Sequence, residues 1–210
     1  MNYELKKGYS IKTFFHIGFG PKSKDPTTRA YNTDEWAALR LDIDPAVQTD
    51  IIGAMTDISS LAPASVHAIF SSHNIEHPYP HEAPIALAEF KRVLKPDGFL
   101  IVTAPDQQAV FALIAEDKLT EPAYHSPAGP IAPLDILYGH RPSMARGNLF
   151  MIHRCGFTQK VLSGAIQQAG FVQVAIRRRE HPFSDLWAFP TILFMEETEL
   201  RPLTASPFPG

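Results

Sequence analysis

Short runs of apolar residues recur along the chain, and polar segments rich in glycine or proline separate them. Runs of this length between turn residues predict buried strands. The run at 99–104 is almost wholly apolar, which is typical of a central strand in a parallel sheet. We therefore expect seven strands, at about 11–18, 39–45, 50–53, 65–72, 99–104, 171–176 and 189–195.

Other stretches place apolar residues three and four positions apart, which is the spacing of one helix face. Helices are predicted over about 81–94, 107–115 and 158–169. Asp106 and Thr158 are suitable N-terminal caps for the last two, and Gly170 ends the third. A further, short helix is expected to begin at Thr33 or Asp34.

Strands and helices alternate along the chain, up to a closing pair of strands that no helix separates. This order predicts a three-layer α/β/α sheet of Rossmann-like type with about seven strands, the last of them antiparallel. We read residues 1–200 as a single domain with an irregular insertion at about 118–157. Residues 201–210 are rich in proline and are expected to form a flexible tail.

Composition narrows the class of protein. With 210 residues, of which 45% are hydrophobic, the chain is long enough for one domain with a substantial core. Its net charge is −3 and its basic residues are dispersed, which argues against nucleic acid as a partner. The single cysteine, Cys155, excludes an internal disulfide. Because no membrane span or signal peptide is recognisable either, we expect a cytoplasmic protein that does not enter a membrane.

Candidate chemistry begins where the first strand ends, at Gly18 and Gly20. In open α/β sheets ligands bind beyond the carboxyl ends of strands, and glycine lets the backbone approach them closely. The third glycine of a dinucleotide loop is absent, since Ser23 takes its place, and no G-K-[ST] is present. Asp42 and Asp44 end the second strand, where an acid commonly binds a ribose. A nucleoside without a pyrophosphate is therefore the favoured ligand.

Four motifs follow one another along the chain. They are His-Ile-Gly-Phe-Gly-Pro at 16–21, Leu-Asp-Ile-Asp-Pro at 41–45, Phe-Ser-Ser-His-Asn-Ile-Glu-His at 70–77 and Phe-Lys-Arg-Val-Leu-Lys-Pro-Asp-Gly at 90–98. With them the sequence resembles the class I S-adenosylmethionine (SAM)-dependent methyltransferases of the methyltransferase domain 11 type. The resemblance spans roughly 14–106 and, more weakly, 150–195. It implies a methyltransferase sheet, SAM as the cofactor, and a small-molecule or sugar-like acceptor as the substrate.

The resemblance also implies which residues contact the cofactor. The two glycines would line the methionine tail. Asp42, or else Asp44, would bind the ribose hydroxyls, and Asp57 and Ile58 would flank the adenine. His73 would lie near the sulfonium and the methyl acceptor. The full set of expected cofactor contacts is His16, Gly18, Gly20, Asp42, Asp44, Asp57, Ile58, Ser72 and His73.

A base is needed only if the methyl acceptor is a hydroxyl or amine that must lose a proton. His73, His140 and His153 are the catalytic candidates, because histidine titrates near neutral pH. In this fold an insertion after the fifth strand usually covers the acceptor site, and such a lid would exclude water. Besides the small-molecule substrate, a homodimer is an option.

Two other functions stay open. His16 stands where the family has an acid, and Ala54 stands where an acid commonly meets the adenine. These departures favour, as the alternative, a non-catalytic binding protein that keeps the methyltransferase fold with a degenerate cofactor site. A nucleotide-dependent oxidoreductase is the third hypothesis, and the missing glycine speaks against it. Glu76 and His77 suggest a metal or acid–base pair, but no H-E-x-x-H or carboxylate triad accompanies them, so no metal is expected.

Overall fold

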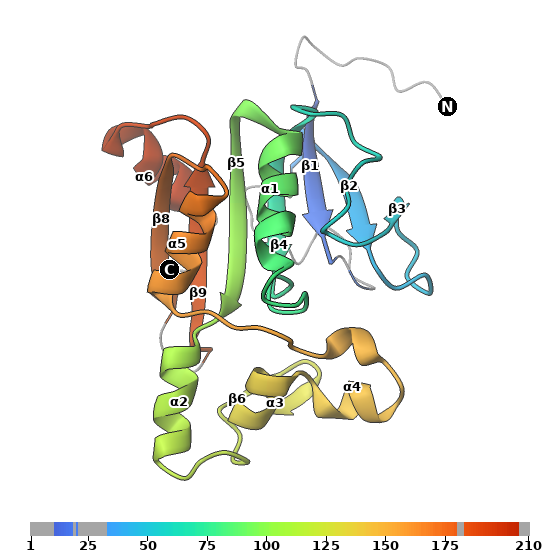
Figure 1. The fold of residues 1–210 in the computed structure, drawn as a ribbon, viewed down its shortest axis with the longest axis vertical. Coiled ribbons are helices and arrows are strands. Elements are labelled where there is room, and N and C mark those ends of the chain that lie inside the picture. The colour runs from blue at the N-terminus through green and yellow to red at the C-terminus, as the bar shows by residue number, and fades with distance from the viewer. Residues whose placement is uncertain (1–10, 19, 21–32, 180–182, 206–210) are drawn as a thin grey trace.

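The computed structural model of the chain describes residues 11–18, 20, 33–179 and 183–205 (Figure 1). Seven strands form one sheet in the order β3-β2-β1-β4-β5-β9-β8. These strands are β1 (Lys12–Ile17), β2 (Trp36–Asp42), β3 (Ile51–Ile52), β4 (Val66–Ser72), β5 (Leu94–Pro105), β8 (Gln173–Arg179) and β9 (Asp185–Thr191). Neighbours from β3 to β5 are parallel, whereas β9 is antiparallel to both β5 and β8. The predicted seven-stranded sheet with an antiparallel last strand is confirmed.

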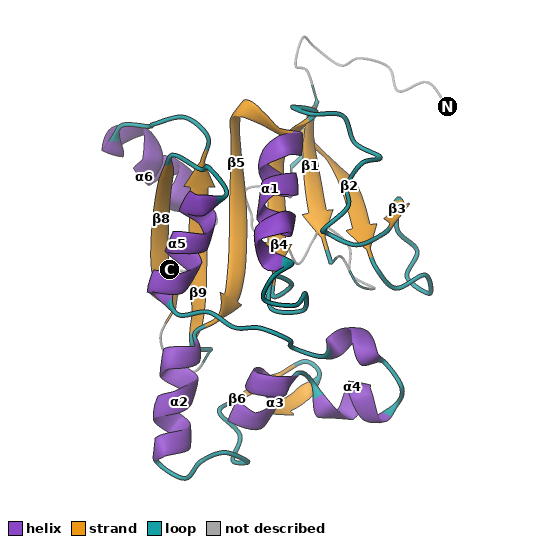
Figure 2. Cartoon of the chain, viewed as in Figure 1, coloured by secondary structure: helices purple, strands orange, loops and turns teal. Residues whose placement is uncertain are grey.

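Helices cover both faces of this sheet. Helix α1 (Ala83–Val93) and helix α5 (Gln159–Gln168) contact each other on one face (Figures 1 and 2). Helix α6 (Glu197–Ala205) serves the other face, where its Leu200 packs against the buried side chains of the sheet. The predicted three layers are therefore present.

The alternation of side chains along β1 shows how the two cores form. Successive residues of a strand point to opposite faces. Phe15 and Ile17 belong to the large aliphatic core under α1 and α5, whereas Phe14 belongs to a smaller, aromatic core on the other face. His16 shares this second face, since its ring lies 5.3 Å from the ring of Phe70.

The insertion at 118–157 is more regular than its composition predicted. It follows helix α2 (Gln107–Ala115) and contains a hairpin, two short helices and a 3₁₀ turn. These are β6 (Tyr124–Ser126), β7 (Gly129–Ile131), α3 (Pro133–Tyr138), α4 (Arg141–Ala145) and η1 (Leu149–Met151). The whole segment lies beyond the carboxyl ends of the parallel strands, where a lid was expected (Figure 1).

Some boundaries predicted from the sequence were wrong. No helix begins at Thr33 or Asp34, because the chain turns there and β2 starts at Trp36, paired with Lys12 of β1. The fifth strand, predicted from residue 99, begins at Leu94, because Leu94 pairs with Val66 across an irregular register.

The C-terminal prediction also changes. The expected tail begins inside α6, which continues to Ala205, so residues 201–205 are helical. Residues 206–210 and the loop predicted at 21–32 lie outside the described residues. Among the helices that are described, none is both long and apolar enough to cross a membrane.

Candidate active site

The glycine turn after β1 is fastened to the tip of β2 by Asp42. One carboxylate oxygen of Asp42 accepts the backbone N–H of Gly20 at 2.7 Å, and the other accepts the N–H of Asp44 at 2.9 Å. The side chain of Asp44 in turn accepts the N–H of Ala46 at 2.8 Å. Asp42 thus organises both loops at this edge, while Asp44 mainly shapes its own turn.

Gly18 lies against Asn74, a residue that the sequence analysis did not single out. Gly18 has a φ of +64°, and a Cβ at this position would overlap the side-chain amide of Asn74. That amide donates to the carbonyls of Ile17 and Ser72, at 2.8 and 2.9 Å. Asn74 therefore joins the carboxyl ends of β1 and β4. Its place inside the motif at 70–77 was the only signal for it in the sequence.

The edge formed by β1 and β2 fits the ribose and methionine portions of SAM. Gly20 has a φ of +58°, and no atom of the described residues lies within 4 Å of the point where its Cβ would be. Counting the described residues alone, each oxygen of Asp42 accepts one N–H and keeps a second lone pair. Those lone pairs could accept the hydroxyls of a ribose diol.

The expected adenine contacts fit less well. Asp57 is exposed and accepts the N–H of Ser59 at 3.1 Å. Ile58 has no exposed surface and belongs to the aliphatic core, which argues against contact between its side chain and an adenine ring. His16 is only 6% exposed and lies between the rings of Phe14 and Phe70.

His73 is the residue around which the polar groups at the end of β4 gather. It has a φ of +52°, and its backbone N–H donates to the carbonyl of Thr103 at 3.0 Å. Its imidazole lies 3.3 Å from an oxygen of Asp185 and 3.6 Å from an oxygen of Glu76. Ser72, the residue before it, shares a hydrogen bond of 2.9 Å with the hydroxyl of Thr103. The side chain of His73 is 41% exposed, so it also faces the space beyond the strands.

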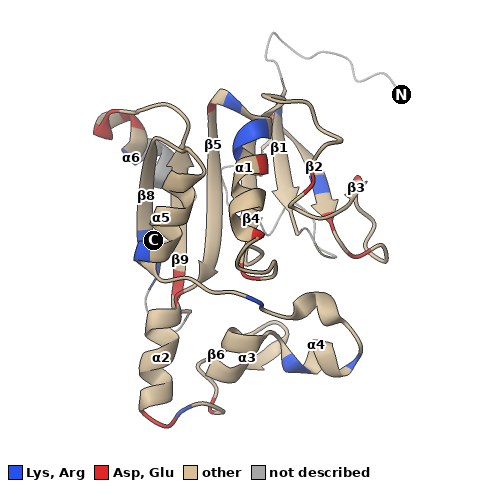
Figure 3. Ribbon diagram, viewed as in Figure 1, with Lys and Arg blue, Asp and Glu red and all other residues tan. Residues whose placement is uncertain are grey.

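Asp185 holds His73 from the start of β9. It is fully buried and accepts two hydrogen bonds from the guanidinium of Arg179, at 2.8 and 2.6 Å, and one from the indole of Trp187 at 3.2 Å. The acidic start of β9 and the basic end of β8 adjoin (Figure 3). The sequence analysis did not single out this pair, because Arg179 and Asp185 belong to separate strands.

The charges in this cluster are coupled. Burial by itself would lower the pKa of His73, but the hydrogen bond to Asp185 and the charges of Asp185 and Glu76 outweigh burial and raise that pKa to about 9. The same pairing overcomes the effect of burial on the two acids and lowers the pKa of Asp185 and of Glu76. The resting site is therefore a histidine cation between two carboxylates.

The insertion contributes two further groups to this region. His153 lies with its Nε2 atom 4.0 Å from Glu76, and burial lowers the pKa of its imidazole. Tyr124 of β6 is near the same acids, since burial and the charge of Asp185 raise the pKa of its phenol. The structure thus brings His73 and His153 together around Glu76. His140, in contrast, bonds through Nδ1 to the hydroxyl of Ser143 at 2.8 Å, at the start of α4.

Comparison with known proteins identifies the fold. Residues 27–102 match the family model described as a methyltransferase domain. No curated protein matches the sequence. Among solved structures, a SAM-dependent methyltransferase from Archaeoglobus fulgidus superposes with a TM-score of 0.58 at 11% identity, covering 85% of each chain.

Two other solved structures are similar. A SAM-dependent methyltransferase from Methanosarcina mazei has a TM-score of 0.54 at 13% identity, over 87% of this chain and 93% of that one. The other is the 1,6-didemethyltoxoflavin-N1-methyltransferase of Burkholderia thailandensis, solved with 1,6-didemethyltoxoflavin and S-adenosylhomocysteine bound. It has a TM-score of 0.53 at 14% identity, over 85% of this chain and 70% of that one. At these identities the structural matches show the fold, and the family model adds the domain. Residues 27–102 thus match a methyltransferase domain, and the chain has the fold of the class I SAM-dependent methyltransferases.

Proposed function

We propose that this protein transfers a methyl group from SAM to a small-molecule acceptor, sugar-like acceptors included, bound between the carboxyl edge of the sheet and the insertion at 118–157. The observation that carries this proposal is the half-exposed His73, held by Asp185 and Glu76 beneath the insertion. From the insertion, His153 reaches to 4.0 Å from Glu76, and the pKa of the buried Tyr124 is raised in part by the charge of Asp185. The site is thus built from both the sheet and its cover, as an enclosed acceptor site requires.

The cofactor would lie along the ends of β1, β2 and β4. SAM supplies a methyl group on a positively charged sulfur, so the protein must mainly align the acceptor and exclude water. In this proposal Gly18 and Gly20 line the methionine tail and Asp42 binds the ribose. The remaining expected contacts are His16, Asp44, Asp57, Ser72 and His73. Ile58 would contribute through its backbone only, since its side chain is buried.

A small acceptor is favoured by two facts. The insertion is a compact segment of short elements that lies directly over the strand ends (Figure 2). The similar Burkholderia thailandensis enzyme was solved with the small molecule 1,6-didemethyltoxoflavin bound. If the acceptor is a hydroxyl or amine, His153 is better placed than His140 to accept its proton, because it lies beside Glu76 and burial lowers its pKa. His73, the other sequence-based candidate nearby, rests as a cation and has no lone pair for that proton.

Calorimetric titration of the full chain with S-adenosylhomocysteine tests the cofactor site first. We expect binding, and its absence at millimolar ligand would overturn the proposal. Transfer of a labelled methyl group from SAM to pools of small hydroxyl, amine and sugar compounds then tests the reaction. A His73→Ala variant should lose transfer.

The alternative is a non-catalytic binding protein with the methyltransferase fold. It is favoured by His16, which is buried among aromatic rings where the family has an acid, and by Ala54. Cofactor binding without transfer to any acceptor pool would favour this alternative. Methyl transfer would exclude it.

A further inference from the structure

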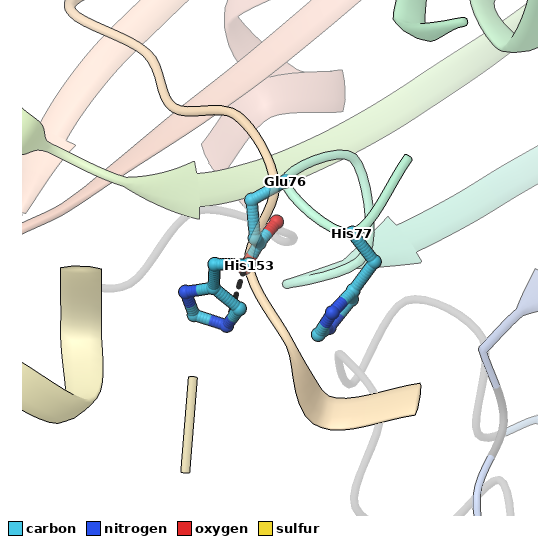
Figure 4. Close-up of side chains that lie close together, drawn as sticks. All are labelled: Glu76, His77 and His153. Atoms are coloured by element: carbon cyan, nitrogen blue, oxygen red, sulfur yellow. Dashed lines mark ion pairs between the residues drawn. The ribbon is translucent and has the colours of Figure 1, made fainter. Parts of the chain in front are cut away.

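We propose that Glu76, His77 and His153 form a binding site for a divalent transition-metal ion such as Zn²⁺ (Figure 4). Each of the three residues offers a ligand atom, and these atoms lie within 4.8 Å of one another. The first two follow β4, whereas His153 comes from the segment after η1. This site shares Glu76 and His153 with the proposed acceptor site, but metal binding itself does not depend on methyl transfer.

The first argument is the environment of Glu76. Its side chain is 1% exposed, and neither carboxylate oxygen has a hydrogen-bond partner among the residues that the structure describes. A buried carboxylate without hydrogen bonds is costly unless a cation compensates it. The imidazole nitrogens of His73 and His153 lie 3.6 and 4.0 Å from one of its oxygens, which is beyond hydrogen-bond distance. The His73 cation thus balances part of the charge of Glu76 but leaves its oxygens without a bonded partner.

The second argument is the orientation of the two imidazoles. His77 Nδ1 lies 2.9 Å from the carbonyl of Ile152, and His153 Nδ1 lies 2.8 Å from the carbonyl of Ile136. A carbonyl only accepts, so both Nδ1 atoms carry a hydrogen, and Nε2 of a neutral ring keeps its lone pair. Histidines that bind metals usually donate their other N–H to such a carbonyl, which orients the ring.

The buried carboxylate and the two oriented imidazoles lie next to one another. The two rings approach edge to face, with centroids 4.9 Å apart, and the Glu76 carboxylate lies beside them (Figure 4). Lone pairs on neutral imidazoles and a carboxylate repel one another in a water-poor site. A metal cation between them would replace this repulsion by three bonds.

The third argument is the scaffold that supports the three residues. The carbonyl of Glu76 accepts the backbone N–H groups of Arg154 and Cys155, at 2.9 and 3.1 Å. The guanidinium of Arg154 donates to the carbonyl of His77 at 2.8 Å. These bonds fasten the segment after β4 to the segment after η1, so the ligands are held by fixed backbone, as a binding site needs.

The ligand set indicates the class of ion. Two imidazoles and one carboxylate suit Zn²⁺ and related transition metals, whereas Mg²⁺ and Ca²⁺ prefer sites made of oxygen atoms. Three protein ligands would leave a coordination position for water or another small molecule. The expectation from sequence, that no metal binds, rested on the missing local motif, which could not include His153.

The test is metal binding by the full, tag-free chain after treatment with a chelator. Co²⁺ is titrated and followed by its visible absorbance, and Zn²⁺ is then used to displace it. We expect one equivalent of either ion to bind and the Co²⁺ spectrum to show nitrogen and oxygen ligands. Failure of the folded wild-type chain to bind either ion stoichiometrically would overturn the proposal.

Single variants locate the site. His77→Gln and His153→Gln should each weaken Zn²⁺ binding at least tenfold, while His125→Gln, at an exposed position in β6, should not change it. Circular dichroism checks that each variant is folded. His73→Gln tests whether the buried charge of Glu76 is balanced by a metal ion or by the imidazole of His73 alone. Retained metal binding in that variant supports the metal site. Unchanged binding in both the His77 and His153 variants would show that the ion binds elsewhere and refute the assignment.

Discussion

The backbone of Gly18 lies directly against the side-chain amide of Asn74. That amide occupies the space that a Cβ at position 18 would need. The contact joins the glycine turn after β1 to the loop after β4. Since Asn74 also bonds the carbonyls of Ile17 and Ser72, it sets how closely the two strand ends approach. Any ligand that crosses these ends depends on this spacing.

A Gly18→Ala variant should therefore be strongly destabilised. A positive φ costs an alanine about 1–2 kcal/mol, and the overlap with Asn74 adds to that cost. We therefore expect the free energy of unfolding, measured with urea, to fall by about 3 kcal/mol. Gly20→Ala is the matched control, because Gly20 has a similar φ but open space around it. Its expected loss is about 1 kcal/mol. Equal losses at the two positions would contradict the role given to Asn74, and adding Asn74→Ala to Gly18→Ala should recover part of the stability.

Replacing Asp42 should weaken cofactor binding. In Asp42→Ala both the N–H of Gly20 and the proposed ribose hydroxyls lose their acceptor. We expect the Kd for S-adenosylhomocysteine to rise at least tenfold, which is about 1.4 kcal/mol. Asp44→Ala is the comparison, because that side chain bonds its own turn, and its effect should be smaller. An unchanged Kd in Asp42→Ala would exclude Asp42 as the ribose ligand.

Asp185 should be important for stability as well as for the site. It is fully buried against Arg179 and Trp187, so Asp185→Ala leaves a partly buried guanidinium without its carboxylate. Loss of one partner of a buried pair predicts a decrease of about 3 kcal/mol in the free energy of unfolding. Glu197→Gln is the control, because Glu197 pairs with Arg201 on the surface, where a change of about 0.5 kcal/mol or less is expected. Similar small effects in both variants would mean that the Asp185 pair contributes little.

The contribution of Asp135, in the insertion, to the stability of the fold should decrease at acidic pH. This carboxylate is 4% exposed, and it accepts the N–H of Ala132 at 2.9 Å and two bonds from the guanidinium of Arg141, at 2.7 and 3.0 Å. Burial alone would raise the pKa of Asp135, but these bonds outweigh it and lower that pKa below the ordinary value of 3.8. The unfolded chain therefore binds the proton more tightly than the folded one.

It follows that the stability due to Asp135 is fully present above the ordinary pKa and is lost as the pH falls through 3.8 toward the lower folded value. Urea unfolding of wild type and Asp135→Asn between pH 6 and pH 3 measures this difference. We expect wild type to be the more stable at pH 6, by about 2 kcal/mol, and the gap to close toward pH 3. A gap that stays constant with pH would show that Asp135 does not titrate as described.

The local sequence pattern was sufficient to predict most strands and helices of the sheet layers. Helix α2 covers 107–115, as predicted, and begins at Asp106, whose side chain accepts the N–H of Gln108. Thr158 caps α5 in the same way. Strand β4 occupies 66–72 within the predicted 65–72. These features depend on residues a few positions apart, and such interactions can be read from sequence.

The sequence by itself thus determined the order of the seven sheet strands and of helices α1, α2 and α5, the glycine turn with Asp42 at its edge, and the motifs of a methyltransferase domain. Only the tertiary structure decided which distant residues meet there, namely Asn74 with Gly18, Asp185 with His73, and His153 with Glu76. Pairing with β1 likewise made Trp36 the start of a strand where local signals favoured a helix. The physical reason is that periodicity and capping act over one or two turns of chain. Contacts across a sheet arise only when the hydrophobic core forms and brings separate segments together.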